Sequence, residues 1–173
     1  MPIIDALLQE LEREAQTTKR VLERVPDAQL AWKPHQKSMS LGQLALHIAT
    51  VPGGVAHIAA QPGMDAPPAF IQPSATTAAE LVPALEESVA QARRLLGGMS
   101  DQELMEVWTL KNEGEVVMAM PRVAVLRTIM LNHWYHHRGQ LSVYLRQLNV
   151  PVPSIYGPSA DENPFARQPV ATA

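Results

Sequence analysis

The sequence predicts an all-α protein, an antiparallel four-helix bundle with a small hairpin before the last helix. Four segments repeat apolar residues every three or four positions, which is the pattern of an amphipathic helix. Stretches rich in Pro and Gly separate them, and two of these connections are long. A chain of 173 residues, 46% of them hydrophobic, is long enough to bury one core. Packing four such faces lengthwise against one another is the economical way to bury them.

The first two helices have clear boundaries. The first is expected over residues 3–24, because Pro26 then stops it. The second should begin after Ser40, since a serine followed three residues later by Gln43 can form a capping box. We expect Pro52-Gly53-Gly54 to kink or break this helix, with a further helical piece running to about residue 61.

The second half of the chain contains two more helices and a hairpin. Thr77 and Glu80 have capping-box spacing and predict a helix over residues 77–96, which Gly97-Gly98 ends. Alternating segments on either side of residues 111–114 predict the small hairpin. Pro121 suits the first position of the last helix, expected to run to Leu148.

The chain is expected to form a single domain over residues 1–173. The long loop over residues 61–74 should be mobile or functional, because long loops on compact domains are usually one or the other. The tail after about residue 158 contains little that can pack, so we expect it to be partly disordered.

Histidines interrupt the apolar stripe of the last helix. On a regular helix His133 and His137 lie one turn apart on the core-facing side, where two imidazoles can hold one metal ion. Histidines that are hydrogen bonded within the core are the competing interpretation. His136 could share the site but falls at the edge of the stripe. The stretch is not the zinc-protease motif, because Trp134 occupies the position of its glutamate base.

A third ligand is expected from the second helix. His47 lies in the middle of an apolar stripe there, and His57 is the reserve candidate. His35 lies in a polar loop and should be solvated. Three imidazoles suit a divalent ion, and zinc, nickel, iron and copper are all compatible with such ligands.

Composition excludes several classes of function. The net charge is −3 and no cluster of Lys or Arg is present, so we expect neither nucleic acid nor a membrane surface as a partner. The absence of cysteine excludes disulfides, a thiolate nucleophile and thiolate metal ligands. No secretory leader or membrane-spanning run is recognisable, so a cytoplasmic location is expected.

Several motifs together resemble those of the DinB/YfiT-like superfamily of metal-dependent enzymes. They occur in the family's order over most of the chain: Trp32-Lys33-Pro34, Ser40 to Ile48, His133 to Leu141, Tyr144 to Gln147 and Val152 to Gly157. The resemblance implies a bundle with up-down-down-up connectivity, often a homodimer. It also implies a divalent metal held by His47, His133 and His137. Pro52-Gly53-Gly54 departs from the smooth second helix that the family would have there.

The function expected from these residues is that of a metal-dependent enzyme. The resemblance implies transfer of a small cellular thiol to an electrophilic small-molecule substrate. The alternatives are a metal-dependent hydrolase and a non-catalytic metal- or ligand-binding stress protein. No catalytic residue is assigned, although His136 and Gln43 are candidate bases. Arg138 is either an anion-binding group or part of a solvated helix face, and Gly139 either permits close approach or is simply tolerated.

Overall fold

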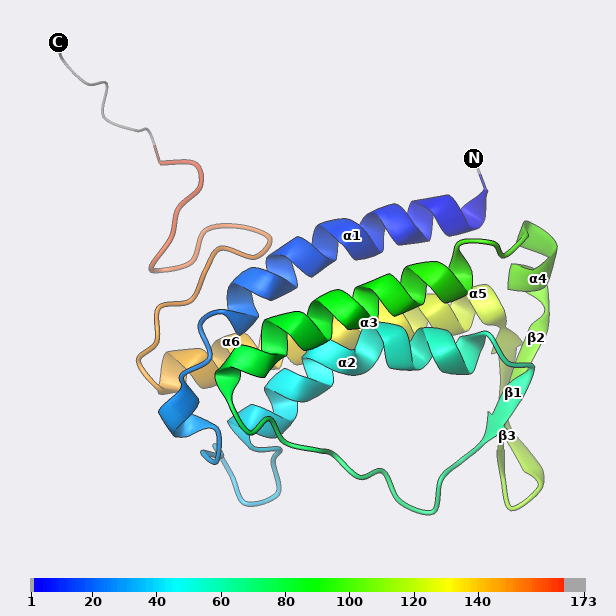
Figure 1. Ribbon diagram of the computed structural model, residues 1–173, viewed down its shortest axis with the longest axis horizontal. Coiled ribbons are helices and arrows are strands. Elements are labelled where there is room, and N and C mark those ends of the chain that lie inside the picture. Colours follow the sequence, from blue (N-terminus) through cyan, green and yellow to red (C-terminus); the bar gives the residue numbers. More distant parts are fainter. Residues whose placement is uncertain (1, 167–173) are drawn as a thin grey trace, which may run out of the picture.

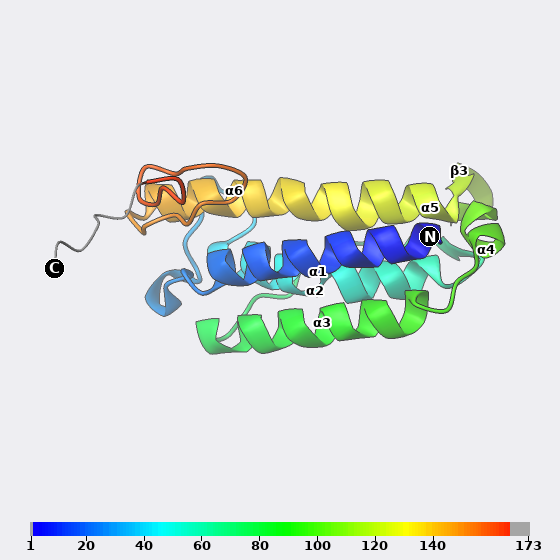
Figure 2. The same cartoon turned by 90° about the horizontal axis from the view of Figure 1, so that it is seen from above.

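The computed structural model describes residues 2–166, which are mostly helical. The long helices α1 (Ile3–Leu22), α2 (Leu41–Ala59) and α3 (Leu81–Leu96) lie alongside a fourth helical run that ends the fold (Figures 1 and 2). Helices α2 and α3 run in one direction, whereas α1 and the last run point the other way (Figure 1). The prediction of an all-α protein is therefore confirmed only as a mainly helical fold, because a small three-stranded sheet lies at one end.

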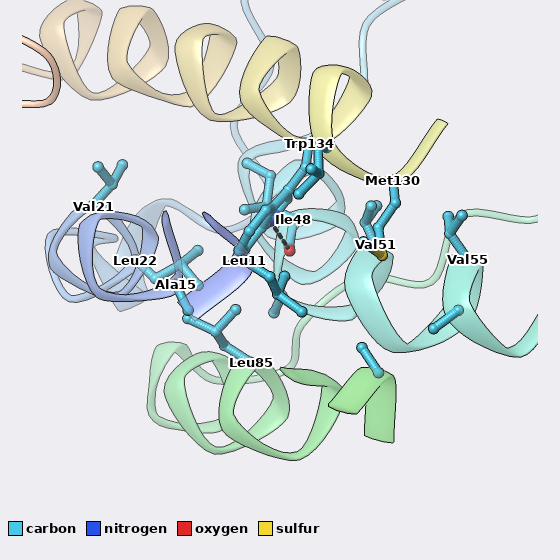
Figure 3. Packing of buried hydrophobic residues seen from close by; sticks show 14 of the residues in the cluster. Leu11, Ala15, Val21, Leu22, Ile48, Val51, Val55, Leu85, Met130 and Trp134 are labelled. Atoms are coloured by element: carbon cyan, nitrogen blue, oxygen red, sulfur yellow. Dashed lines mark hydrogen bonds between the residues drawn. The ribbon is translucent and has the colours of Figure 1, made fainter. Parts of the chain in front are cut away.

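The core lies between these helices, where their apolar stripes meet (Figure 3). The first helix ends within two residues of its predicted end and faces the core with one continuous stripe. The buried residues of α1 are Ile4, Leu7, Leu11, Ala15, Thr18, Val21 and Leu22.

Helix α2 begins as predicted but does not break. The Ser40 Oγ accepts a hydrogen bond from Gln43 N at 3.2 Å, and the Gln43 side chain accepts one from Ser40 N at 2.9 Å. The helix then continues through Pro52-Gly53-Gly54 to Ala59. The predicted break is wrong, because side chains from two neighbouring helices complete the hydrogen bonding around the proline.

Proline has no N–H, so Pro52 leaves the carbonyl of Ile48 without its helical donor. Trp134 of the last helical run supplies one, with its indole Nε1 2.8 Å from that carbonyl oxygen (Figure 3). On the other side, Gly53 N donates to Ser88 Oγ of α3 at 2.7 Å. A Cβ at position 53 would lie 2.8 Å from the Ser88 carbonyl, so this close contact between α2 and α3 requires glycine.

Helix α3 follows a 3₁₀ turn over Ala78–Glu80, and the predicted capping box of Thr77 and Glu80 is present. The short helix α4 (Asp101–Met105) comes next, capped by Ser100 in the same way. Both starts were recognisable because these caps are local in sequence.

The predicted hairpin is confirmed and belongs to a three-stranded sheet. Strand β2 (Val107–Asn112) pairs antiparallel with β3 (Glu115–Pro121), and Gly114 turns between them with a φ of 86°. Strand β1 (Gly63–Asp65) pairs in parallel with β2, giving the order β1-β2-β3. The sequence prediction missed β1, because its partner lies far along the chain.

The loop after β1 is held at both ends. The sheet anchors its beginning, and at the other end Ala75 N donates to the Gly42 carbonyl at 3.2 Å. The side chain of Gln43 also donates to the carbonyl of Gln72 at 3.1 Å. The free span is therefore shorter than the predicted loop of residues 61–74.

The last helical run is not one regular α-helix. It consists of α5 (Arg122–Val125), a π-helical segment (Leu126–Asn132) and α6 (His133–Gln147). A π turn holds more residues than an α turn, so the helix positions after it are rotated about the helix axis. The side chains of α6 that face the core therefore differ from the His133 and His137 expected there. The buried residues of α6 are Trp134, Arg138, Leu141 and Leu145.

The segment after α6 packs more than its composition suggested. Asp161 forms an ion pair with Arg146, and Glu162 forms one with Arg20 of α1. These pairs hold the segment against the first and last helices. Residues 167–173, where we expected disorder, lie outside the described part of the chain.

The donor of Trp134 allows a stability test. Trp134→Phe keeps an aromatic ring but leaves the Ile48 carbonyl buried without a donor, which should lower the free energy of unfolding by about 1–3 kcal/mol. Urea unfolding measures the change. In a Pro52→Ala background the restored backbone N–H can serve that carbonyl, so the same substitution should cost less. Equal losses in both backgrounds would contradict this role.

Candidate metal site

Three of the predicted residues lie together between two helices. His47 comes from α2, and His133 and His137 come from the first turns of α6. The Nε2 atoms of His133 and His137 are 2.7 Å apart, and the His47 ring centroid lies 5.2 and 4.6 Å from theirs. One nitrogen of each ring lies within 4.8 Å of the others. The structure thus brings these side chains together, while metal binding by them stays a prediction.

Residues next to the cluster orient the rings. His137 Nδ1 lies 2.8 Å from Gln140 Oε1, which can only accept a hydrogen bond. Nδ1 therefore carries the proton, and the lone pair of Nε2 faces the other histidines. Sequence reasoning missed Gln140, although a position three residues after a candidate ligand on the same helix is the signal that could have found it. Nδ1 of His133 is buried and has no hydrogen bond of ordinary geometry among the described residues.

Burial keeps the three imidazoles neutral. Desolvation, together with the nearby His137 and His133, lowers the pKa of His47 to about 4. Desolvation also lowers the pKa of His133 and of His137, against smaller opposing effects from the Ile129 backbone and Gln140. Neutral imidazole is the form that binds a metal ion, so the cluster is in the ligand form near neutral pH.

The cluster forms part of the wall of a cavity of about 480 Å³. The remaining wall is mostly apolar and comes from α2, the π-helical segment and two connections. The lining residues are Met39, His47, Thr50, Val51, Gly54, Val55, Ile58, Phe70, Gln72, Ile129, His133 and His137.

The other candidates from the sequence lie outside this cavity. His136 is exposed, although its ring centroid is 5.0 Å from that of His137, and His57 is exposed on the outer side of α2. His35 is exposed, and its Nδ1 accepts a hydrogen bond from a backbone N–H. Gln43 uses its side chain in the cap of α2 and on the loop, so it has no free group to act as a base.

Arg138 is buried, so the interpretation of a solvated helix face is wrong. Its guanidinium donates to the Glu14 carboxylate of α1 at 2.6 Å and contacts the rings of Tyr135 and Tyr156. These contacts join α6 to α1 and leave no free cation for an anionic substrate. A Cβ at Gly139 would meet no atom within 4 Å, so no close approach explains this glycine.

The fold and the site together define the class of protein. It is a helical protein in which three neutral imidazoles face an apolar cavity. The model of the DinB family matches residues 2–167, and the chain belongs to that family. This confirms the resemblance seen in the sequence motifs.

The relatives support this assignment. The chain is 26% identical over 167 residues to the uncharacterized protein YrdA of Bacillus subtilis (strain 168), covering 92% of this chain and 91% of that protein. A DinB-like protein of Bacillus cereus ATCC 10987 superimposes with a TM-score of 0.68 at 24% identity, over 88% of this chain and 97% of the other. The DinB-like protein YjoA of Bacillus subtilis gives a TM-score of 0.61 at 17% identity, over 83% and 92%. Likeness at these identities shows a shared fold.

No helix within residues 2–166 is both long enough and apolar enough to span a membrane.

The lowered pKa of His47 predicts a pH-dependent stability in metal-free protein. Its folded pKa of about 4 lies below the unfolded value of 6.5, so the unfolded chain binds more protons between those values. Stability should therefore fall as the pH drops from 6.5 towards 4. His47→Gln should make the dependence in this window shallower, as measured by urea unfolding with chelator present.

The matched control is His57→Gln, which changes an exposed histidine of the same helix and should leave the pH dependence unchanged. Equal slopes for wild type and His47→Gln would show that His47 is not the group responsible.

Proposed function

We propose that His47, His133 and His137 bind one divalent metal ion, and that the protein is a metal-dependent enzyme transferring a small thiol to an electrophilic carbon. The observation that carries this proposal is the convergence of three neutral imidazoles at the wall of a cavity. Three protein ligands leave a coordination position for a reactant, as catalytic sites do and closed structural sites do not.

The residues present fit a metal ion. The donor set is purely imidazole, which suits zinc, nickel or iron, and the family assignment agrees with a metal site. Gln140 orients His137 in the way that neighbouring groups commonly orient metal ligands. The Trp134–Ile48 hydrogen bond joins the residues next to His133 and His47, so the two ligand-bearing helices are held in register.

The cavity itself provides no nucleophile. Its described lining contains no Cys, Lys, Asp or Glu, and the Thr50 hydroxyl already donates to the Leu46 carbonyl at 2.9 Å. A divalent ion would lower the pKa of a coordinated thiol or water. The nucleophile must therefore be a cosubstrate, and the apolar wall excludes bulk water from it.

In the proposed reaction the thiolate sulfur forms a bond to the electrophilic carbon, and the leaving group departs with the bonding electrons. The thiol proton passes to solvent, because no carboxylate lines the described cavity. His136 is exposed and outside the lining, so we assign it no role as a base. The chain's own part is to position the reactants and keep water out.

The runner-up is a metal-dependent hydrolase, in which water takes the place of the thiol at the same site. A binding protein without catalysis follows if the cavity takes a ligand but no reactant.

We further propose that the four helical runs form a four-helix bundle. The homodimer, the cytoplasmic location and the absence of a nucleic-acid partner stay predictions, and light scattering decides the first.

Metal content tests the ligand set. Alanine at His47, His133 or His137 should remove most of the metal from the purified protein, because three ligands act together, whereas His57→Ala and His136→Ala should retain it. Full metal content in all three ligand variants would reject the site.

Chelation should lower the melting temperature with most of the helix retained, since a bound ion stabilises the folded state.

Turnover tests the reaction class. Metal-loaded protein assayed with neutral electrophiles should show activity that requires an added low-molecular-weight thiol, and His133→Ala should lower it at least about 100-fold, the effect expected for loss of a metal-site group. His136→Ala is the control and should remain active. Turnover without thiol would favour the hydrolase, and activity equal in His133→Ala would exclude the metal site from catalysis.

A further inference from the structure

The side chains that line the cavity beside the histidines determine which molecules it can hold. Apart from the three histidines, its described lining contains no side chain that can carry a charge. A charged group placed along the apolar wall, away from the histidines, would lose its hydration without gaining a partner, which is costly. A neutral, largely apolar molecule would instead gain contacts with the walls.

Few polar groups inside the cavity remain free to select a substrate. The Thr50 hydroxyl is bound to the Leu46 carbonyl, and the carbonyl of Gln72 accepts from Gln43. Apolar side chains supply most of the remaining wall, and Phe70, with 74% of its surface exposed, lies at the rim. The side-chain amide of Gln72 remains as a neutral polar group, so shape and apolar contact contribute most of the selection.

Gly54 lies where this cavity meets a neighbouring hollow. It lies on α2 two turns beyond His47 and lines the cavity, yet a Cβ built there would meet no atom within 4 Å. Gly54 and Thr50 also line a neighbouring hollow of about 380 Å³ against α3. The missing side chain leaves open space at this position, although glycine within a helix costs up to about 1 kcal/mol relative to alanine.

We propose that the electrophilic substrate is an uncharged, mainly apolar molecule that lies along α2 between the histidines and Ile58, and that Gly54 sets the size it can have. This proposal extends the proposed function and rests on it, because the bound molecule is a substrate only if the protein is an enzyme. Pockets of about 300–1,000 Å³ commonly hold small organic ligands, and the cavity of about 480 Å³ lies in that range. Charged parts of a cosubstrate would stay outside the rim.

The probes are methyl 4-chloro-3,5-dinitrobenzoate and the corresponding carboxylate, which differ in charge but share one ring. Binding is measured by calorimetry without added thiol on chelator-treated protein, so that no metal ion offers the carboxylate a countercharge. The chain has no cysteine that could consume the probe. The ester should bind at least about tenfold more tightly than the carboxylate, because the carboxylate finds no countercharge. Equal or tighter binding of the carboxylate, or no binding of the ester, would overturn the proposal.

Gly54→Leu should weaken ester binding at least about tenfold by filling the cavity, with metal content unchanged. Gly139→Leu is the matched control, a helical glycine with equally open surroundings outside the cavity, and should bind the ester like wild type. Gly54→Ala adds one methyl group and should weaken binding of the butyl ester more than that of the methyl ester. Unchanged binding in both Gly54 variants would refute the role of this position.

Metal analysis of the same preparations before chelation separates the two proposals. Ester binding with no metal at the histidines would reject the proposed function and leave the apolar pocket supported. Metal at the histidines without ester binding would reject the substrate class and leave the metal site supported.

Discussion

The hydrogen bond from Trp134 to the Ile48 carbonyl is the interaction on which the arrangement of the site depends. Pro52 removes the donor that this carbonyl would have in a regular helix, and a tryptophan from another helix replaces it. The two residues are the immediate neighbours of His133 and His47. One buried contact therefore compensates a defect in α2 and sets the distance between the helices that carry the histidines. On the opposite side Ser88 Oγ of α3 accepts a hydrogen bond from Gly53 N, so α2 is held between α3 and α6.

The π-helical segment decides which side chains of the last run face the core and which face the cavity. It ends one residue before His133. Beyond it the buried positions are those of Trp134 and Arg138, and His133 and His137 are left half-buried at the edge of the stripe. Insertions of this kind are common at functional sites, because they redirect side chains without ending the helix. On a regular helix the apolar periodicity would have placed both histidines on the core-facing side.

Sequence reasoning succeeded where the signals are local. Helix starts with capping boxes, the hairpin and the one-turn spacing of His133 and His137 could be predicted, since each depends on residues a few positions apart. Sequence reasoning failed where a residue depends on a contact with another residue far away in the sequence. The break expected at Pro52 is prevented by Trp134 and Ser88, strand β1 exists only through β2, and Arg138 is buried only because Glu14 and Tyr156 lie against it. The ligand set itself still awaits its metal analysis.

The loop between β1 and α3 is tethered at both ends, by the sheet on one side and by contacts to the start of α2 on the other. Its middle carries Phe70 at the rim of the cavity. Immobilising a chain costs conformational entropy for every residue that loses its freedom. A molecule that settles beneath this loop has to order only the short span between the two tethers. By holding the start of this loop, the sheet thereby lowers the entropic cost of enclosing whatever binds beside the histidines.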